Sequence, residues 1–309
     1  AFKLRKECLA SGMRTLAQAC TRTCNLAPRR RRAAASALKD PHTISNELDA
    51  ETSRAIIMRL ESRGKDAVFC SLFDSYFPHV IDNCANVLEV GAGTGVVCRA
   101  LVRRGYRGKL LGTDQSEVFV DAAKEFAASE GLASLRFAVA DARALSAGVH
   151  SRDFDGVLMH TLLSHVDDPV HVLKSAREVA KAGASLVIVD GDYMGLSYHS
   201  PSKHDLSQLM SNALVTTTFT SPTVVRDLPS LLADSGWAIA SASGHCVSEI
   251  GETFSYWRSF AEAYMPRIIG SGRVEEAKVR EWWADQIELA SQKRFFASCT
   301  YYTVIARAV

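Results

Sequence analysis

The chain has 309 residues, of which 47% are hydrophobic and 23% charged, a composition typical of a globular protein with a sizeable core. A net charge of +2 is too small to require nucleic acid or an anionic membrane as the partner. No apolar run approaches the roughly 18 residues of a membrane-spanning helix, so we expect no membrane span. The eight cysteines include no CxxC pair and no Cys/His set at metal-ligand spacing, so we expect free thiols in a reducing compartment.

The N-terminal segment differs in composition from the rest of the chain. Residues 1–39 hold ten Lys or Arg and a single acid, Glu7, and include the run Arg29–Arg32. Basic, acid-poor segments with apolar residues at helical spacing are typical of mitochondrial or plastid targeting. We therefore predict that residues 1–46 form a basic arm that directs the protein to the mitochondrion, with the plastid or the cytoplasm as alternatives. The arm is also where we expect contact with a larger protein assembly, and it is the part through which nucleic acid would bind; a basic tail without fixed structure is the other interpretation.

Residues 47–309 read as one domain that begins with two helical patterns over 47–80. The apolar stripes of these helices, which include Leu60 and Phe73, are expected to face the core. A second interpretation makes the two helices a lid over a bound ligand.

From residue 84 onward, short β-branched apolar runs alternate with helical patterns, which predicts βαβ units and a parallel sheet. Strands are expected at 86–90, 109–113, 135–139, 155–159 and 184–190. Helices are expected near 96–104, 116–130 and 169–182. The last third predicts a helix near 223–235 and strands at 236–243 and 299–307. Substrates bind outside the carboxyl ends of the strands in such folds, so 191–222 and 247–297, with 47–80, are expected to cover the site.

A glycine-rich segment follows the first strand. Gly91-Ala92-Gly93-Thr94-Gly95 joins this strand to a helix, and residues without a Cβ let the backbone approach a ligand closely. Position 96 is Val, where a dinucleotide-binding loop requires Gly. Glu89 precedes the loop; an acid there would repel a pyrophosphate but suits the cationic groups of S-adenosylmethionine.

Two further acids end the next two strands. Asp114 lies about twenty residues beyond the loop, where a carboxylate can accept both ribose hydroxyls. Asp141 closes the third strand and is placed to accept from an adenine amino group. The glycine loop and the acids therefore favour S-adenosylmethionine over a dinucleotide as the cofactor.

With these residues the chain resembles the class I S-adenosylmethionine-dependent methyltransferases, particularly the small-molecule branch of the ubiquinone and menaquinone enzymes. The resemblance implies an α/β, Rossmann-like fold with a seven-stranded, mostly parallel sheet, helices on both faces and an antiparallel last strand. It implies that the glutamate and the glycine loop hold the methionine part, the segment 114–115 the ribose and the segment 141–142 the adenine. The expected cofactor-binding residues are Glu89, Gly91, Ala92, Gly93, Gly95, Asp114, Gln115, Asp141, Ala142 and His160.

The catalytic candidates follow the fourth and fifth strands. His160 and His165 belong to the segment that lines the methyl-transfer side of the pocket in the family that this chain resembles. His165 is the better general base, because its loop faces the substrate and an imidazole titrates near neutral pH; the alternative is a capping or packing histidine before Pro169. Tyr193 is a further candidate. Asp190 and Asp192 suggest a magnesium site of the catechol type, but a third ligand is missing, so we predict no metal.

The acceptor is expected to be an apolar small molecule, because the predicted cover segments are aromatic; the alternative is that these side chains form core or a protein-contact surface. The aromatic residues in question are Tyr193, Tyr198, Phe254, Tyr256, Trp257, Trp282, Trp283, Phe295 and Phe296. The expected activity is methyl transfer to an oxygen or nitrogen atom. The alternative is a structural or assembly subunit of a mitochondrial complex, such as a respiratory complex or the mitoribosome, that keeps the cofactor pocket with little or no turnover.

Overall fold

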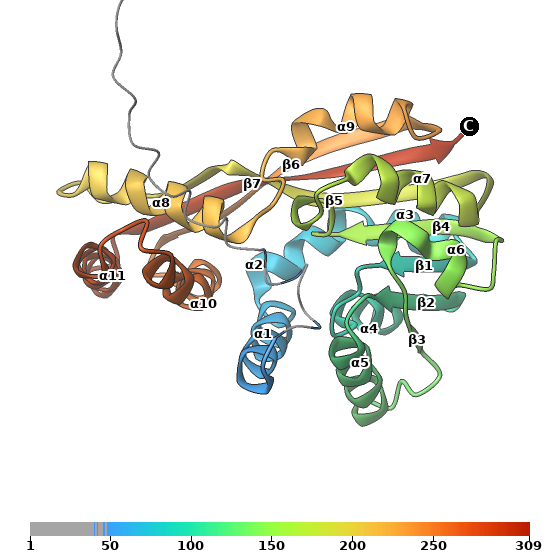
Figure 1. Ribbon diagram of the computed structural model, residues 1–309, viewed down its shortest axis with the longest axis horizontal. Helices are drawn as coiled ribbons and strands as arrows, with labels where there is room; N and C mark the ends of the chain where they lie inside the picture. The colour runs from blue at the N-terminus through green and yellow to red at the C-terminus, as the bar shows by residue number, and fades with distance from the viewer. Residues whose placement is uncertain (1–39, 41, 43–45, 47) are drawn as a thin grey trace, which may run out of the picture. The chain divides into compact units, whose positions relative to one another are not determined.

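The computed structural model describes residues 40, 42, 46 and 48–309 (Figure 1). Most of the arm predicted over residues 1–46 therefore lies outside the described residues. The strands are β1 (Asn86–Val90), β2 (Lys109–Asp114), β3 (Arg136–Val139), β4 (Phe154–His160), β5 (Ala180–Tyr198), β6 (Trp237–Gly251) and β7 (Phe295–Ala308). The longer helices are α1 (Ala50–Arg63), α3 (Phe77–Asn83), α4 (Val96–Arg103), α5 (Glu117–Ser129), α7 (Pro169–Val179), α8 (His204–Thr218), α9 (Val224–Ala233), α10 (Tyr256–Ser271) and α11 (Glu276–Ser291), and α2 (Ala67–Cys70) and α6 (Leu145–Gly148) are single turns.

The strands form one seven-stranded sheet in the order β3-β2-β1-β4-β5-β7-β6. The first five strands pair in parallel, and β7 runs antiparallel to both β5 and β6. This arrangement confirms the fold expected from the sequence. None of the helices within the described range is long and apolar enough to cross a bilayer.

Helices cover both faces of the sheet, and side-chain alternation along the strands explains why. Val87 and Val187 belong to one buried cluster, whereas their neighbours Leu88 and Leu186 belong to another. The first cluster lies under α3, α4 and α5, and the second lies under α6, α7 and α9 (Figure 1). Central strands of this kind are apolar on both sides because each face must be buried.

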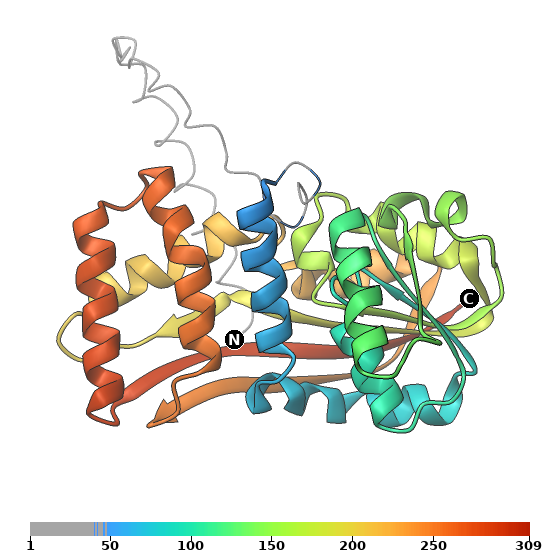
Figure 2. The same cartoon turned by 90° about the horizontal axis from the view of Figure 1, so that it is seen from below.

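Three strands run past the parallel part of the sheet. β5, β6 and β7 continue beyond the lengths that the sequence pattern predicts, and α8, α10 and α11 pack together beside these extensions (Figure 2). The Tyr198 ring lies 5.2 Å from that of Trp282 and 6.2 Å from those of Trp257 and Phe295. These four aromatic residues are core, not pocket lining, whereas Tyr193 and Tyr256 lie nearer the site described below.

Candidate active site

The loop between β1 and α4 carries the glycine motif. Gly91, Gly93 and Gly95 have φ angles of 73°, 52° and 75°, a region that other residues rarely adopt. A Cβ added to Gly93 would lie 3.2 Å from Cδ1 of Leu60, so the loop runs close under α1. The Thr94 hydroxyl also donates to Oε1 of Glu61 at 2.7 Å, which ties the same helix to the loop. These contacts favour the interpretation of α1 as a cover over the glycine loop.

Asp114 ends β2 beside this loop. Its carboxylate oxygens accept the backbone N–H of Gly93 and that of Ser116, each at 2.9 Å. Because a carboxylate has about four lone-pair sites, acceptor capacity remains for two ribose hydroxyls. The neighbouring Gln115 side chain instead donates to the backbone oxygen of His42 at 2.8 Å and so holds the N-terminal segment.

Asp141 begins a short 3₁₀ turn after β3. Its carboxylate accepts the backbone N–H of Arg143 at 2.9 Å and pairs with the guanidinium of the same residue at 2.8 Å. The side-chain hydrogen bond from Arg143 holds the pKa of Asp141 below its ordinary value, so the carboxyl is ionised at neutral pH. Ala142 is the next residue and packs against the core beneath α7. An ionised carboxylate at this position can accept from an adenine amino group.

Glu89 is a buried acid at the end of β1. It is 2% exposed, and the Cys98 thiol donates to Oε2 at 2.7 Å. No ion pair to Glu89 is found in the part of the chain that the structure describes. Burial raises the pKa of Glu89 to about 7, because removing a charge from water favours the neutral form. A cation placed next to this carboxyl would reverse that balance, so the site favours a positively charged ligand group.

The raised pKa of Glu89 predicts a pH dependence of stability. In the folded, ligand-free protein Glu89 keeps its proton up to about pH 7, whereas in the unfolded chain it loses the proton near pH 4.5. The folded state therefore binds more protons between these values, and the Glu89 contribution to the free energy of unfolding falls as the pH rises from about 4.5 to about 7. The fall is at most about 3 kcal/mol. Urea unfolding at a series of pH values measures it.

The variant Glu89→Gln isolates this effect. Burial lowers the pKa of His42 and of His160 to about 3, and these groups are protonated in the unfolded chain below about pH 6.5. Their contribution to stability therefore rises with pH in the same window and opposes that of Glu89. The two histidines contribute equally to the free energy of unfolding of wild type and variant, so their contributions cancel in the difference. A difference that is constant from pH 4.5 to 7 would contradict the raised pKa.

His165 lies at the end of a 3₁₀ turn (Leu163–His165) that follows β4. Its Nδ1 is 2.7 Å from Oδ2 of Asp40, which is 4% exposed. A carboxylate only accepts, so Nδ1 carries the proton and Nε2 is the basic nitrogen. Burial alone would raise the pKa of Asp40, but the interactions with His165 and His42 outweigh burial, and the pKa is lowered.

The His165 ring packs against two other rings, and its segment reaches the glycine loop through Leu162. Its centroid is 4.4 Å from that of His42 and 5.1 Å from that of Phe219. Leu162, in the same segment, lies so close to the loop that a Cβ on Gly91 would be 2.7 Å from it. An imidazole oriented by a carboxylate next to a ligand loop has the geometry of a general base. This arrangement favours the base over a packing histidine.

The two other catalytic candidates have different surroundings. His160 is buried among Phe69, Phe73 and Tyr76, with ring centroids 5.1 to 5.9 Å away, and neither ring nitrogen has a hydrogen-bond partner among the described residues. Tyr193 stacks on a phenylalanine at 3.6 Å, and burial raises its pKa far above the ordinary value. Neither group accepts a proton readily at neutral pH, so the structure favours His165 alone as the base.

Known proteins resemble this chain in sequence and in fold. Residues 87–183 match the family model of a methyltransferase domain. The ubiquinone biosynthesis O-methyltransferase of Coxiella burnetii is 32% identical over 101 residues, which are 33% of this chain and 41% of that protein. An uncharacterized 37.1 kDa protein in transposon TN4556 of Streptomyces fradiae is 23% identical over 72% of this chain and 62% of its own length. The crystal structure of BH2331 from Bacillus halodurans has a TM-score of 0.52 at 16% identity, covering 75% of this chain and 97% of that one.

The domain match, the sheet order and the glycine loop all indicate a methyltransferase domain. Residues 87–183 form a methyltransferase domain of the class I S-adenosylmethionine-dependent superfamily. The resemblance drawn from the sequence motifs is therefore confirmed. The chain spans less than two thirds of the length of either sequence relative, so the methyl acceptor is not given by these matches.

The methyltransferase site also includes residues that the sequence motifs do not indicate. Asp40 is one, since its partner His165 is 125 residues away and no local pattern links the two. Arg59 and Arg63 are others; they lie four residues apart on α1, a spacing visible in the sequence once the helix is assigned. Tyr264 on α10 completes the set, with its hydroxyl 3.3 Å from Nε2 of His42.

Asp190 and Asp192, expected after the fifth strand, lie within the longer β5 and are occupied by other partners. The Asp190 carboxylate accepts the backbone N–H of Ser164 at 3.0 Å and that of Gly191 at 2.9 Å. Asp192 pairs with Arg226 at 2.9 Å. Over residues 48–309 and the three described positions before them, no group of three or more His, Cys, Asp or Glu side chains is placed to hold a metal ion.

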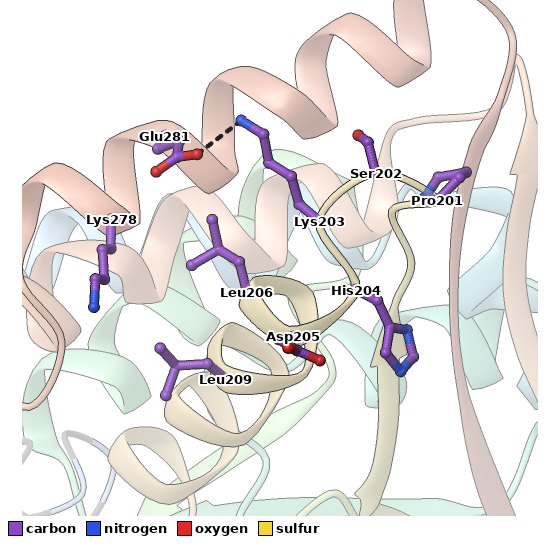
Figure 3. Close-up of a pocket in the computed structure, with 9 residues that line it drawn as sticks. All are labelled: Pro201, Ser202, Lys203, His204, Asp205, Leu206, Leu209, Lys278 and Glu281. Atoms are coloured by element: carbon purple, nitrogen blue, oxygen red, sulfur yellow. Dashed lines mark ion pairs between the residues drawn. The ribbon is translucent and has the colours of Figure 1, made fainter.

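A pocket of about 590 Å³ lies elsewhere, between α8 and α11 (Figure 3). An ion pair between Lys203 and Glu281 of 3.0 Å joins the two helices there. The pocket shares no residue with the methyltransferase site, so it is not where methyl transfer would occur.

Proposed function

We propose that the protein transfers the methyl group of S-adenosylmethionine to an oxygen or nitrogen atom of a small, largely apolar acceptor. The observation that carries this proposal is the Asp40–His165 pair beside the glycine loop, because it provides a base where an acceptor would meet the cofactor. The similarity to an O-methyltransferase supports oxygen as the acceptor atom. The Phe219 ring next to His165, with Tyr193 stacked on it, supports an apolar acceptor.

The residues present fit S-adenosylmethionine. Glu89 is a buried acid that lacks a paired cation in the described chain, and the amino group of the methionine part would supply one. Arg63 has a buried Nε without a hydrogen-bond partner, and its Nη1 lies 3.4 Å from Thr161 at the end of β4; it would take the methionine carboxylate. Asp114 would accept the ribose hydroxyls, and Asp141 the adenine amino group.

The cofactor and the residues of the chain contribute different parts of the proposed reaction. When bound, S-adenosylmethionine supplies a methyl group already activated by a sulfonium. His165 Nε2 takes the proton from the acceptor atom, and Asp40 holds Nδ1–H and stabilises the resulting imidazolium. The rings of His42 and Phe219 hold the imidazole in a fixed plane, and this orientation positions the acceptor. The same rings exclude water from the base.

Calorimetry with S-adenosylhomocysteine tests the cofactor half of the proposal. We expect the wild type to bind, and Asp114→Asn to bind about 10- to 100-fold more weakly, because the change removes a charged acceptor of the ribose hydroxyls. Asp121→Asn, on the exposed face of α5, should leave the affinity unchanged. Turnover is then sought by incubating the protein with methyl-labelled S-adenosylmethionine and pooled phenols, carboxylic acids and amines.

If neither S-adenosylmethionine nor S-adenosylhomocysteine bound at millimolar concentration, the proposed enzymatic function would be contradicted. That result would favour the alternative of a methyltransferase-like assembly subunit, in which the fold acts as a scaffold. A mitochondrial location and a protein partner for residues 1–46 stay predictions.

A further inference from the structure

Helix α1 presents two arginines to the acceptor side of the site. Arg59 and Arg63 are one helical turn apart and so share a face. The Arg63 guanidinium lies over the Phe69 ring at 4.5 Å, and that of Arg59 lies over the Tyr256 ring at 5.5 Å. Both guanidinium groups stand over an aromatic ring, and the planar fork of such a group matches the geometry of a carboxylate.

These guanidinium groups have buried nitrogens without partners. Nε and Nη1 of Arg59 and Nε of Arg63 are buried and make no hydrogen bond within the described residues, and no acid pairs with Arg59 there. By contrast, the buried guanidinium of Arg99 is paired with Glu61 at 2.6 Å. A buried charge without a partner costs several kcal/mol in real proteins, so a ligand that supplies the missing acceptors gains affinity.

Asp40, a buried acid of the site, is already engaged. Its carboxylate accepts the backbone N–H of His42 at 2.9 Å and is bound to His165 at 2.7 Å. Among the described side chains, no acid forms an ion pair with Arg59 or Arg63.

We propose that the methyl acceptor carries an anionic group, a carboxylate or its equivalent, and that Arg59 binds it. This inference rests on the proposed methyl transfer and narrows its acceptor to an apolar acid. Arg63 stands next to Thr161 at the end of β4, adjacent to the glycine loop, and takes the carboxylate of the cofactor. Arg59, one turn earlier, lies over the Tyr256 ring of α10 and is thus separate from the cofactor carboxylate. The anion at Arg59 and the reacting atom at His165 fix the acceptor at two points.

Calorimetry on protein saturated with S-adenosylhomocysteine tests the assignment. The probes are benzoate, 2-naphthoate and 4-phenylbutyrate, each compared with its neutral amide. We expect the wild type to bind at least one acid at least tenfold more tightly than the matching amide. Arg59→Gln should reduce this preference to less than twofold and leave the affinity for S-adenosylhomocysteine unchanged. Arg63→Gln should weaken S-adenosylhomocysteine binding about tenfold.

Arg54→Gln is the matched control, because Arg54 lies on the exposed face of the same helix. Thermal unfolding of each variant checks that the fold is retained. Equal affinity of acids and amides in the wild type, or no binding of either, would overturn the inference, as would loss of S-adenosylhomocysteine affinity in Arg59→Gln. Failure of the wild type to bind S-adenosylhomocysteine at all would instead refute the proposed function.

Discussion

Gly93→Ala is expected to weaken the binding of S-adenosylhomocysteine by about 100-fold, or about 2.7 kcal/mol. The glycine has a φ of 52°, and an added Cβ would lie 3.2 Å from Leu60 on the helix that covers the loop. Its backbone N–H also donates to Asp114, so a shift of the loop would move the ribose acceptor as well. Calorimetry at fixed pH measures the loss.

Gly131→Ala is the control for backbone strain. Gly131 has a φ of 72°, but nothing lies within 4 Å of an added Cβ, and the residue follows α5 away from the loop. Both variants should lose about 1 to 3 kcal/mol of stability through strain, and only Gly93→Ala should lose cofactor affinity. Equal affinities in the two variants would show that the loop does not contact the ligand.

His165→Gln is expected to lower kcat by about 10²- to 10⁴-fold while leaving the affinity for S-adenosylhomocysteine within twofold. The glutamine keeps a polar side chain of similar reach but cannot take up a proton at neutral pH. The rate is measured with the acceptor found by the labelled-methyl screen. Because the imidazole lies between two rings and not against the glycines, the cofactor site should not change.

Asp40→Asn separates orientation from proton transfer. An amide in place of the carboxylate cannot stabilise the imidazolium but leaves the imidazole in place, so we expect a fall in kcat that is smaller than that of His165→Gln. His171→Gln changes an exposed histidine on α7 and should leave the rate unchanged. Full activity in His165→Gln would rule out this residue as the base.

The parallel half of the fold was predictable because its determinants are local. β1, β2 and β4 are apolar runs bounded by polar residues. Ser116 as N-cap and Pro169 in the first turn mark where α5 and α7 begin. The extensions of β5, β6 and β7 were not predictable in the same way. The extension of β5 over residues 191–198 forms because it pairs with residues 297–301 of β7, and that pairing is a tertiary property.

The residues of the site likewise fall into those that the sequence predicts and those that depend on tertiary contacts. The sequence indicates the glycine loop, Glu89, Asp114 and Asp141 because each follows a strand, and the carboxyl ends of parallel strands meet at one edge of the sheet. It does not indicate Asp40, which lies in a segment that composition assigns to the basic arm. The contact that brings Asp40 to His165 depends on how residues before α1 pack against the loop after β4, and this has no periodic signature.

The bond between Asp40 and His165 couples the ionic state of the base to the attachment of the segment that precedes α1. When His165 takes up a proton, its hydrogen bond to the carboxylate becomes an ion pair and grows stronger. By thermodynamic reciprocity, proton transfer to the base also strengthens the attachment of residue 40 to the loop after β4. The segment before α1 would therefore be held most firmly at the moment of catalysis.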